Sequence, residues 1–388
     1  MMNTFPPSAD AQVTLANWRL HPFNRWAFHH VSEVVPSAVI RNDPDNVQHL
    51  EIGSQIAMPG CTFSDENLDF AAFSDRCQLD GLVILHKGRI IAEHYPALMR
   101  HQDPHILMSV SKSSLGLLAG ILSARGLLDI EAPVTSYIPE VARTGFAESS
   151  VRHLLDMRSG VAFVEDYLTT VGPMIEYRKS TNWNPLEPGE QPNDLRGFFL
   201  TLTEKSGPDG GVFDYKSPCT DLLGWVIERA GGQPYAEFFT ELLWGPMQAE
   251  APAMITVDRL GAPRAAGGLS MTTRSLAQVG QLLVEGGGGV IPADWIEDIE
   301  TAGDPQAWDD GGFKAEFGDI SMHYRSKWYV MRERGPILMG LGVHGQNLIV
   351  DRKAELVMAR FCSAAAPLDV ASDLAAVSLF EAVREILA

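Results

Sequence analysis

The sequence predicts an α+β protein in which both ends of the chain build one antiparallel sheet around an inserted, mostly helical segment. Strand patterns occur near the start, at 82–95, and return between 328 and 361. Helical patterns fill the interval between them and close the chain at 369–386. Because opening and closing strands can pair across an insertion, this order favours one shared sheet with flanking helices.

The first half of the chain supplies a hairpin and a helix. Residues 82–85 and 90–95 are apolar runs on either side of a turn that contains Gly88, which predicts a β-hairpin. From 109 to 125 the apolar residues recur at helical spacing, and Gly126 ends the run.

The second half alternates in the same way. Further helices are predicted at 150–156, 221–229 and 273–285, and strands at 328–331, 337–339, 346–350 and 356–361. Asp369 is placed to cap the closing helix. We therefore expect an N-terminal arm at 1–76 packed on the body, an α/β domain at 77–130 and 265–388, and a mostly helical domain at 131–264.

Composition narrows the class of protein. The chain has 388 residues, 45% of them hydrophobic, which suits a large globular enzyme. Its formal net charge of −19 makes nucleic acid and anionic membranes poor partners, so we expect a small-molecule substrate. The sequence leaves the oligomeric state open between a monomer and a homodimer.

The chain shows no export or metal-binding pattern. Residues 1–13 lack a basic start followed by an apolar core, which favours a cytoplasmic location. The cysteines lie far apart, which predicts free thiols. His101 and His105 are four apart, but Pro104 breaks the helix that would align them on a metal. We expect neither a metal nor a cofactor.

The most informative motif is Ser109-Val110-Ser111-Lys112, at the start of the helix predicted over 109–125. Positions three apart share a helix face, so the amine of Lys112 can lie beside the hydroxyl of Ser109. A partly desolvated lysine can act as the base that a serine nucleophile needs. Taken alone, the tetrapeptide fits the solvated first turn of an ordinary helix equally well.

Two further groups would complete a serine acyl-transfer site. Tyr215 follows a loop-like stretch and could pass a proton to the leaving group, with a nearby lysine favouring its phenolate form; a surface tyrosine is the alternative. The run 340–345 has glycines that allow backbone to approach a ligand, as an oxyanion N–H requires, although a plain tight turn is also consistent. A strand rather than a helix follows this run, which excludes dinucleotide binding. His344 could be a polar group of the active site or simply a residue of the turn.

Taken in order, the Ser-x-x-Lys motif, the loop tyrosine and the glycine-rich strand resemble the serine β-lactamases and penicillin-binding proteins. Within that superfamily the chain is most similar to the 6-aminohexanoate-dimer (nylon-oligomer) hydrolases and the class C β-lactamase-like esterases. The stretches that carry this similarity are 15–18, 22–26, 109–113, 151–157, 221–225, 267–270, 324–328 and 342–346.

The resemblance implies a role for each site residue. Ser109 would be the acylated nucleophile, Lys112 its base, and Tyr215 the tyrosine of Tyr-x-Asn. The N–H groups of Ser109 and Val343 would form the oxyanion hole. The resemblance also implies two substrate-binding residues, Tyr167 at the scissile amide and Trp328 as an aromatic wall. We add His344 to the expected substrate-binding residues from its place in the glycine-rich run.

Two departures argue against strong β-lactamase or cell-wall peptidase activity. Ser217 replaces the asparagine of Tyr-x-Asn, and Gly340-Leu341-Gly342 lacks the lysine of Lys-Thr-Gly. Without that lysine, a β-lactam carboxylate loses a natural partner. We therefore expect a serine hydrolase for esters or small linear amides. The alternatives are a weak β-lactamase or D-amino-acid peptidase, and a non-catalytic binding protein with the same fold.

Overall fold

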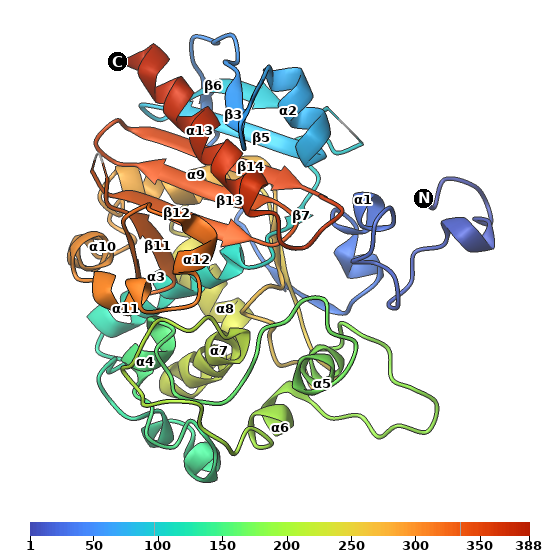
Figure 1. Ribbon diagram of the computed structural model, residues 1–388, viewed down its shortest axis with the longest axis vertical. Helices are drawn as coiled ribbons and strands as arrows, with labels where there is room; N and C mark the ends of the chain where they lie inside the picture. The colour runs from blue at the N-terminus through green and yellow to red at the C-terminus, as the bar shows by residue number, and fades with distance from the viewer. Residues whose placement is uncertain (97, 334) are drawn as a thin grey trace.

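A computed structural model describes residues 1–96, 98–333 and 335–388. An eight-stranded sheet runs through the molecule in the order β10-β11-β12-β13-β14-β5-β6-β2 (Figure 1). Its strands are β2 (Glu51–Ile52), β5 (Leu79–His86), β6 (Arg89–His94), β10 (Met322–Arg325), β11 (Trp328–Met331), β12 (Ile337–Gly342), β13 (Gln346–Asp351) and β14 (Leu356–Cys362).

Strands from the two ends of the chain meet at the centre of this sheet. Strand β14 pairs antiparallel with β5, with Met358 opposite Ile84, and β5 forms the predicted hairpin with β6. This pairing confirms the predicted α+β class and the sheet built from both chain ends. The edge strand β2 departs from the antiparallel pattern, since it pairs parallel with β6.

The two faces of the sheet carry different helices. On β13, Leu348 and Val350 lie against α9 (Thr273–Val284). The alternate residues Asn347 and Asp351 contact α13 (Val370–Leu387), which crosses in front of the sheet in Figure 1. Alternation along a strand therefore places α13 on one face and α9 on the other.

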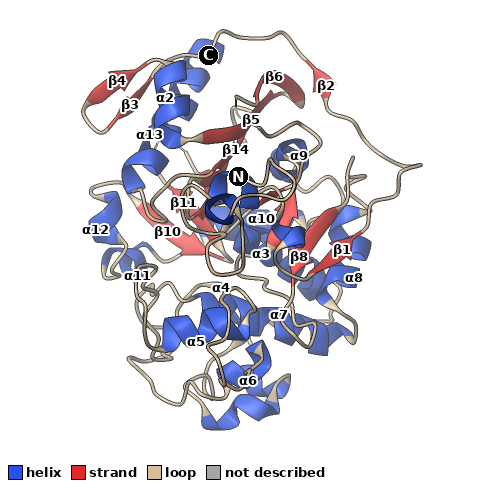
Figure 2. Ribbon diagram, turned by 90° about the vertical axis from the view of Figure 1, so that its right-hand side faces the viewer, coloured by secondary structure: helices blue, strands red, loops and turns tan. Residues whose placement is uncertain are grey.

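The remaining helices lie along and below the sheet, and Figure 2 shows α4 to α7 gathered beneath most of the strands. They are α1 (Asn24–Ala27), α2 (Phe70–Cys77), α3 (Val110–Ala124), α4 (Val151–Leu155), α5 (Pro173–Ser180), α6 (Leu195–Phe199), α7 (Ser217–Gly231), α8 (Tyr235–Phe239), α10 (Ala293–Thr301), α11 (Pro305–Asp309) and α12 (Lys314–Phe317). The helices predicted at 109–125, 150–156, 221–229, 273–285 and 369–386 are all present.

A four-stranded sheet in the order β1-β8-β9-β7 was not predicted. Its strands are β1 (Ser37–Ile40), β8 (Ala253–Thr256), β9 (Leu269–Met271) and β7 (His105–Ile106). Each is only two to four residues long, so no alternation of apolar residues marks it in the sequence. A small hairpin of β3 (Cys61–Phe63) and β4 (Glu66–Leu68) was missed for the same reason.

The N-terminal residues pack onto the body through aromatic side chains. Trp18 is 1% exposed and meets Trp183 edge to face, with ring centroids 5.1 Å apart. Phe28 and Met108 belong to the same buried cluster. The cluster holds the chain that precedes α3 in place, although the division into three domains stays a prediction.

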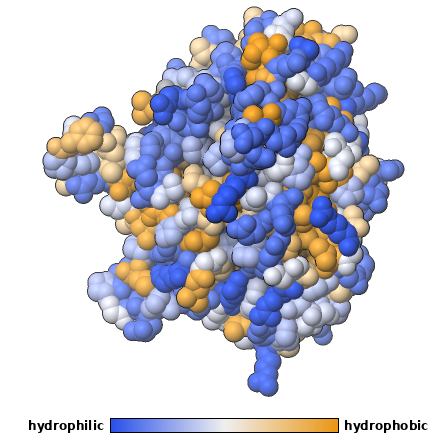
Figure 3. Space-filling model, turned by 180° about the vertical axis from the view of Figure 1, so that it is seen from behind, coloured by the Kyte–Doolittle hydropathy of each residue, from blue (hydrophilic) through white to orange (hydrophobic). Residues whose placement is uncertain are grey.

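The surface is mixed in character. Seen from behind, hydrophobic residues form separate patches among hydrophilic ones (Figure 3). Within the described ranges, no helix is long and apolar enough to cross a membrane. The four cysteines are free, as their spacing predicted, and all four are buried.

Candidate active site

A sharp turn in the backbone presents Ser109 at the start of helix α3. Met108 connects β7 to the helix and adopts a left-handed conformation, with φ of +45°. Ser109 is the N-cap residue, yet its side chain makes no capping hydrogen bond. Its hydroxyl is therefore free to face a cavity rather than satisfy the helix terminus.

Lys112 lies beside Ser109, as their spacing predicted. The Nζ atom of Lys112 is 2.9 Å from Oγ of Ser109, and it donates a hydrogen bond of 2.7 Å to the carbonyl oxygen of Ala266. The lysine side chain is 1% exposed. The alternative that the tetrapeptide is the solvated first turn of an ordinary helix is thus excluded, because the amine of Lys112 is buried against the hydroxyl of Ser109.

Burial changes the protonation of this lysine. It lowers the pKa of Lys112 from 10.5 to about 7, while the negative charge of Glu165 opposes the shift. No carboxylate forms an ion pair with Lys112 within the described ranges. A base with a pKa near neutrality is well matched to accept a proton at physiological pH.

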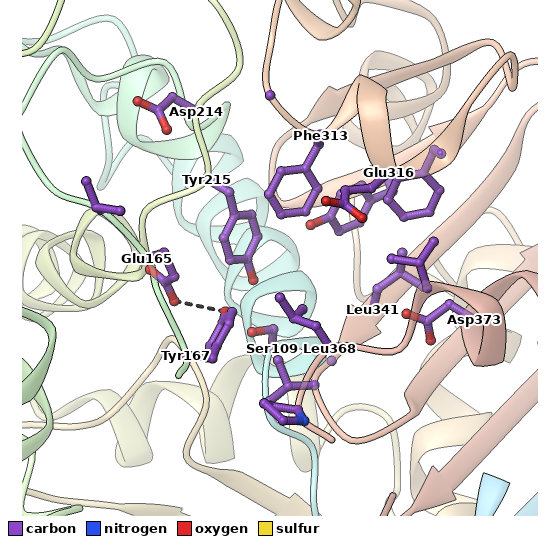
Figure 4. A pocket seen from close by; sticks show the side chains of 18 of the residues that line it. Ser109, Glu165, Tyr167, Asp214, Tyr215, Phe313, Glu316, Leu341, Leu368 and Asp373 are labelled. Atoms are coloured by element: carbon purple, nitrogen blue, oxygen red, sulfur yellow. Dashed lines mark hydrogen bonds between the residues drawn. The ribbon is translucent and has the colours of Figure 1, made fainter. Parts of the chain in front are cut away.

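Tyr215 completes the group around Ser109. The Nζ atom of Lys112 lies 4.8 Å from the centroid of the Tyr215 ring, and the phenol points toward Ser109 (Figure 4). Burial, followed by the charge of Glu165, raises the pKa of Tyr215 above its usual value. The expectation of a favoured phenolate was therefore wrong, since the tyrosine is held as a neutral phenol that can donate a proton.

The glycine-rich end of β12 borders Ser109. A Cβ atom added to Gly342 would lie 3.0 Å from the backbone nitrogen of Ser109. No described carbonyl accepts the N–H of Ser109 or that of Val343, and both residues line the same cavity. The assignment of these two N–H groups as an oxyanion hole stays a prediction that this close approach supports.

The cavity above Ser109 has a volume of about 460 Å³. Aromatic residues from several elements form much of its wall, and Figure 4 shows Phe313 close to Tyr215. Its lining also includes four carboxylates, those of Glu165, Asp214, Glu316 and Asp373. An apolar cavity with a few polar groups is typical of a small-molecule site.

Glu165 is a residue of the cavity wall that the sequence analysis did not single out. Its carboxylate accepts hydrogen bonds from the backbone N–H of Ser217 at 2.6 Å, from the Ser217 hydroxyl, and from the Tyr167 hydroxyl at 3.0 Å. Ser217 therefore braces the loop that carries Tyr215. No spacing in the sequence links residues 165 and 217, so only the fold could reveal this contact.

Tyr167 lies in the cavity wall, as the resemblance implied, and it is partly buried. Its hydroxyl donates to Glu165, and burial followed by that negative charge raises the pKa of Tyr167 well above its ordinary value. The residue is thus a neutral hydrogen-bonding group at the cavity. Contact with a scissile amide stays a prediction.

Trp328 does not line the cavity, so its expected role as an aromatic wall is corrected. It is 0% exposed and absent from the cavity lining, where its neighbour Tyr329 stands instead. Successive residues of a strand face opposite sides of the sheet, so only one of the two can face the substrate. The sequence could not determine which one.

His344 lies outside the first cavity. Its Nδ1 donates to the carbonyl of Ala364 at 2.7 Å, and the residue adopts a left-handed turn conformation with φ of +64°. Burial lowers its pKa to about 4, which keeps the ring neutral. It lines a second, adjoining cavity, so its role as a substrate-binding residue stays a prediction.

A buried ion pair supports the floor of the site. Asp221 on α7 accepts hydrogen bonds from Arg264, from the Tyr177 hydroxyl, and from the backbone N–H of Ala266 at 2.7 Å. The carbonyl of Ala266 in turn accepts from Lys112. Asp221 thus fixes the backbone of Ala266, whose carbonyl contacts Lys112. In the part of the chain that the structure describes, no group of three or more histidine, cysteine, aspartate or glutamate residues could hold a metal ion.

Fold and site together define a hydrolase of the β-lactamase type. The family model described as Beta-lactamase matches residues 70–381, and the chain belongs to this family of serine hydrolases. It is 34% identical over 364 residues to the 6-aminohexanoate-dimer hydrolase of Paenarthrobacter ureafaciens, covering 92% of this chain and 90% of that protein. Esterase EstB of Burkholderia gladioli is 32% identical over 154 residues, which is 38% of each chain.

Solved structures agree on the fold. A Bacillus anthracis protein that carries the provisional name 6-aminohexanoate-dimer hydrolase superposes with a TM-score of 0.88 at 23% identity, covering 98% of both chains. A family VIII carboxylesterase superposes with a TM-score of 0.62 at 17% identity, covering 81% of this chain and 94% of the other. The resemblance drawn from the motifs is thereby confirmed.

Proposed function

We propose that this protein hydrolyses carboxylic esters and small linear amides through an acyl-enzyme on Ser109. The distance of 2.9 Å between Nζ of Lys112 and Oγ of Ser109 carries the proposal. The lowered pKa of Lys112 supports it, because a substantial fraction of the amine is neutral near pH 7. The names of the relatives point to the same substrate classes.

In the first half-reaction, neutral Lys112 takes the proton of Ser109 while Oγ bonds to the substrate carbonyl carbon. The N–H groups of Ser109 and Val343 hold the negative oxygen. The bond to the leaving oxygen or nitrogen then breaks, and the proton passes from Lys112 through the phenol of Tyr215 to the leaving atom. Water repeats these steps in reverse order on the acyl-enzyme and frees the acid and Ser109.

The cavity disfavours β-lactams as the main substrates. Four carboxylates line it, and among the residues described there no arginine, lysine or histidine does. A β-lactam carboxylate would therefore meet repulsion and no cationic partner. Turnover of nitrocefin at a rate close to that of simple esters would contradict this view.

The test of the mechanism is a serine replacement. Ser109→Ala should reduce turnover of p-nitrophenyl acetate at least about 1,000-fold and abolish labelling by a fluorophosphonate probe. Ser123→Ala, at the far end of the same helix, is the matched control and should keep both. Unchanged turnover in purified Ser109→Ala would end the proposal and favour a non-catalytic protein of this fold.

Tyr167 provides the test of amide cleavage. If its hydroxyl bonds to the leaving nitrogen, Tyr167→Phe should lower amide turnover about 10-fold or more while ester turnover stays within a few-fold. The two rates are measured with an ester and an amide of the same acyl group. Equal losses on both substrates would contradict the assignment.

A further inference from the structure

A second tyrosine lies beside the phenol of Tyr215. Tyr329, on β11, forms part of the wall of the cavity above Ser109, and it is 4% exposed. Its ring stacks nearly parallel to that of Tyr215, with centroids 6.4 Å apart and an angle of 21° between the planes. Phe313 packs against both rings, with its centroid 5.3 Å from that of Tyr215 and 6.4 Å from that of Tyr329. The proposed mechanism gives this buried phenol no role.

The hydroxyl of Tyr329 is a hydrogen-bond partner of Tyr215. Burial and the charge of Glu165 raise the pKa of Tyr215, whereas hydrogen bonds with the hydroxyls of Ser109 and Tyr329 lower it. A hydrogen bond lowers the pKa of a phenol when the phenol oxygen accepts it, because the bond then favours the phenolate. The oxygen of Tyr215 therefore has two hydroxyl donors.

Tyr329 keeps its own proton at neutral pH. Burial, followed by the neighbouring Tyr215 and Tyr324, raises the pKa of Tyr329 well above its ordinary value. A neutral phenol has one O–H to donate. Contacts with Phe313 and Tyr324 hold the ring in place, so little further conformational entropy is lost when this O–H is directed at Tyr215.

The two donors differ once the substrate has reacted. In the acyl-enzyme, Oγ of Ser109 is an ester oxygen without a hydrogen atom, so it no longer donates. Tyr329 then remains as the hydroxyl donor of this pair. Negative charge on the oxygen of Tyr215 is unfavourable beside Glu165 in a buried site, and a donor that is already in place reduces this cost.

Hydrolysis of the acyl-enzyme is the step that needs this donor most. In that step Tyr215 takes a proton from the attacking water and gives its own proton to neutral Lys112. Lys112 then returns a proton to Oγ of Ser109 as the acyl bond breaks. Negative charge develops on the oxygen of Tyr215 while these protons move, and Tyr329 retains its own proton throughout.

We infer that Tyr329 is a positioning residue for Tyr215, and that its hydroxyl stabilises the phenol oxygen of Tyr215 mainly during hydrolysis of the acyl-enzyme. This role rests on the proposed function, in which Ser109 is acylated. Acylation by a p-nitrophenyl ester depends on Tyr329 less, because nitrophenolate leaves without a proton.

The variant Tyr329→Phe removes the hydroxyl and keeps the ring. With p-nitrophenyl acetate, kcat/KM reports acylation and should stay within about 3-fold of the wild type, whereas kcat should fall at least about 10-fold. KM should fall with kcat, because the acyl-enzyme accumulates when its hydrolysis becomes the slow step. Stopped-flow measurement should then show a burst of nitrophenolate that matches the enzyme concentration, and mass spectrometry should show the acetylated protein.

Tyr324→Phe is the matched control. Tyr324 lies directly opposite Tyr329 in the pairing of β10 with β11, is 5% exposed, and has its ring centroid 4.8 Å from that of Tyr329. It is not among the described residues that line the cavity. The same loss of a buried hydroxyl should therefore leave kcat and KM of this variant near the wild-type values.

An unchanged kcat in Tyr329→Phe, or a parallel fall of kcat and kcat/KM, would overturn the role of Tyr329. Labelling of Ser109 by a fluorophosphonate requires acylation chemistry alone and should proceed at the wild-type rate in Tyr329→Phe; loss of the label would also count against this role. Wild-type turnover that does not depend on Ser109 contradicts the hydrolase mechanism itself. Ser109-dependent turnover that Tyr329→Phe leaves unaffected removes only the role of Tyr329.

Discussion

At the scale of the residue, the proposed function depends on one lysine that the fold removes from water. Burial of Lys112 disfavours its charged form, and the amine becomes a base suited to neutral pH. The same burial is unfavourable for folding, because an ammonium without a carboxylate partner is desolvated. Activity and stability should therefore respond to this side chain in opposite ways.

The pH profile should report this lysine. Since only the neutral amine accepts a proton, kcat/KM for p-nitrophenyl acetate should rise with pH through an apparent pKa near 7. Asp373 lines the same cavity, and burial raises its pKa to about 6, so its titration would also make kcat/KM rise with pH. The variant Asp373→Asn should keep the rise near pH 7. Loss of that rise in the variant would assign the titration to Asp373 instead of Lys112.

Lys112→Met should be inactive but more stable than the wild type near neutral pH. The pKa falls from 10.5 to about 7 on folding, so the unfolded state binds more protons between these values. In the wild type, burial of the charged Lys112 amine lowers the free energy of unfolding by roughly 5 kcal/mol as an upper bound. This cost is complete below pH 7 and disappears as pH rises toward 10.5.

The stability that Lys112→Met gains over the wild type should therefore shrink as pH rises from 7 to 10. Urea unfolding of both proteins at each pH measures this difference. Lys216→Met is the control, since Lys216 is also buried but lies 2.6 Å from the carboxylate of Asp214. That variant should show no such gain. A less stable Lys112→Met at pH 7 would contradict the cost assigned to the buried amine.

At the scale of the element, the close approach of β12 to the start of α3 requires glycine. A side chain at Gly342 would meet the carbonyl of Leu107 at 2.7 Å and the backbone nitrogen of Ser109 at 3.0 Å. Both are backbone atoms that cannot rotate away. The strand and the helix terminus therefore lie this close only because residue 342 has no Cβ.

Gly342→Ala should lower kcat at least about 100-fold, because it displaces the proposed oxyanion donors. Gly340→Ala, two residues earlier on the same strand, would meet the side chains of Ser113 and Val110 at 3.0 and 3.1 Å, which can adjust. Gly340→Ala should therefore lower kcat by less than about 10-fold. Equal effects of the two substitutions in steady-state assays would argue against an oxyanion hole at this position.

At the scale of the whole molecule, buried ion pairs join segments that lie far apart in the chain. Asp221 on α7 holds Arg264 and the Ala266 backbone, which in turn reaches Lys112 on α3. The pair is buried, with side-chain exposures of 7% for Arg264 and 0% for Asp221. Removing one partner leaves the other charge uncompensated.

Asp221→Asn should accordingly lower the free energy of unfolding by about 3–5 kcal/mol, measured by urea unfolding. Glu51→Gln breaks the exposed pair with Arg89, whose side chains are 68% and 57% exposed, and should change it by less than about 1 kcal/mol. A similarly small change in the free energy of unfolding in both variants would show that the Asp221–Arg264 pair does not stabilise the fold.

The sequence by itself determined the local features of this protein. The pairing of Ser109 with Lys112 depends on helical periodicity alone, and the hairpin of β5 and β6 depends on alternation around one turn. The order of the long strands and helices followed from the same periodicities. The glycines of β12 likewise marked a close approach of backbone before the partner was known.

Only the tertiary structure decided what depends on burial and on distant contacts. It brought Glu165 to Ser217 and Ala266 to Lys112, although no short-range pattern links these positions. It also placed Tyr329 rather than Trp328 at the cavity and kept Tyr215 a neutral phenol. The physical reason is that the direction of a side chain and the water around it are set by everything packed against it, and not by its neighbours in the chain.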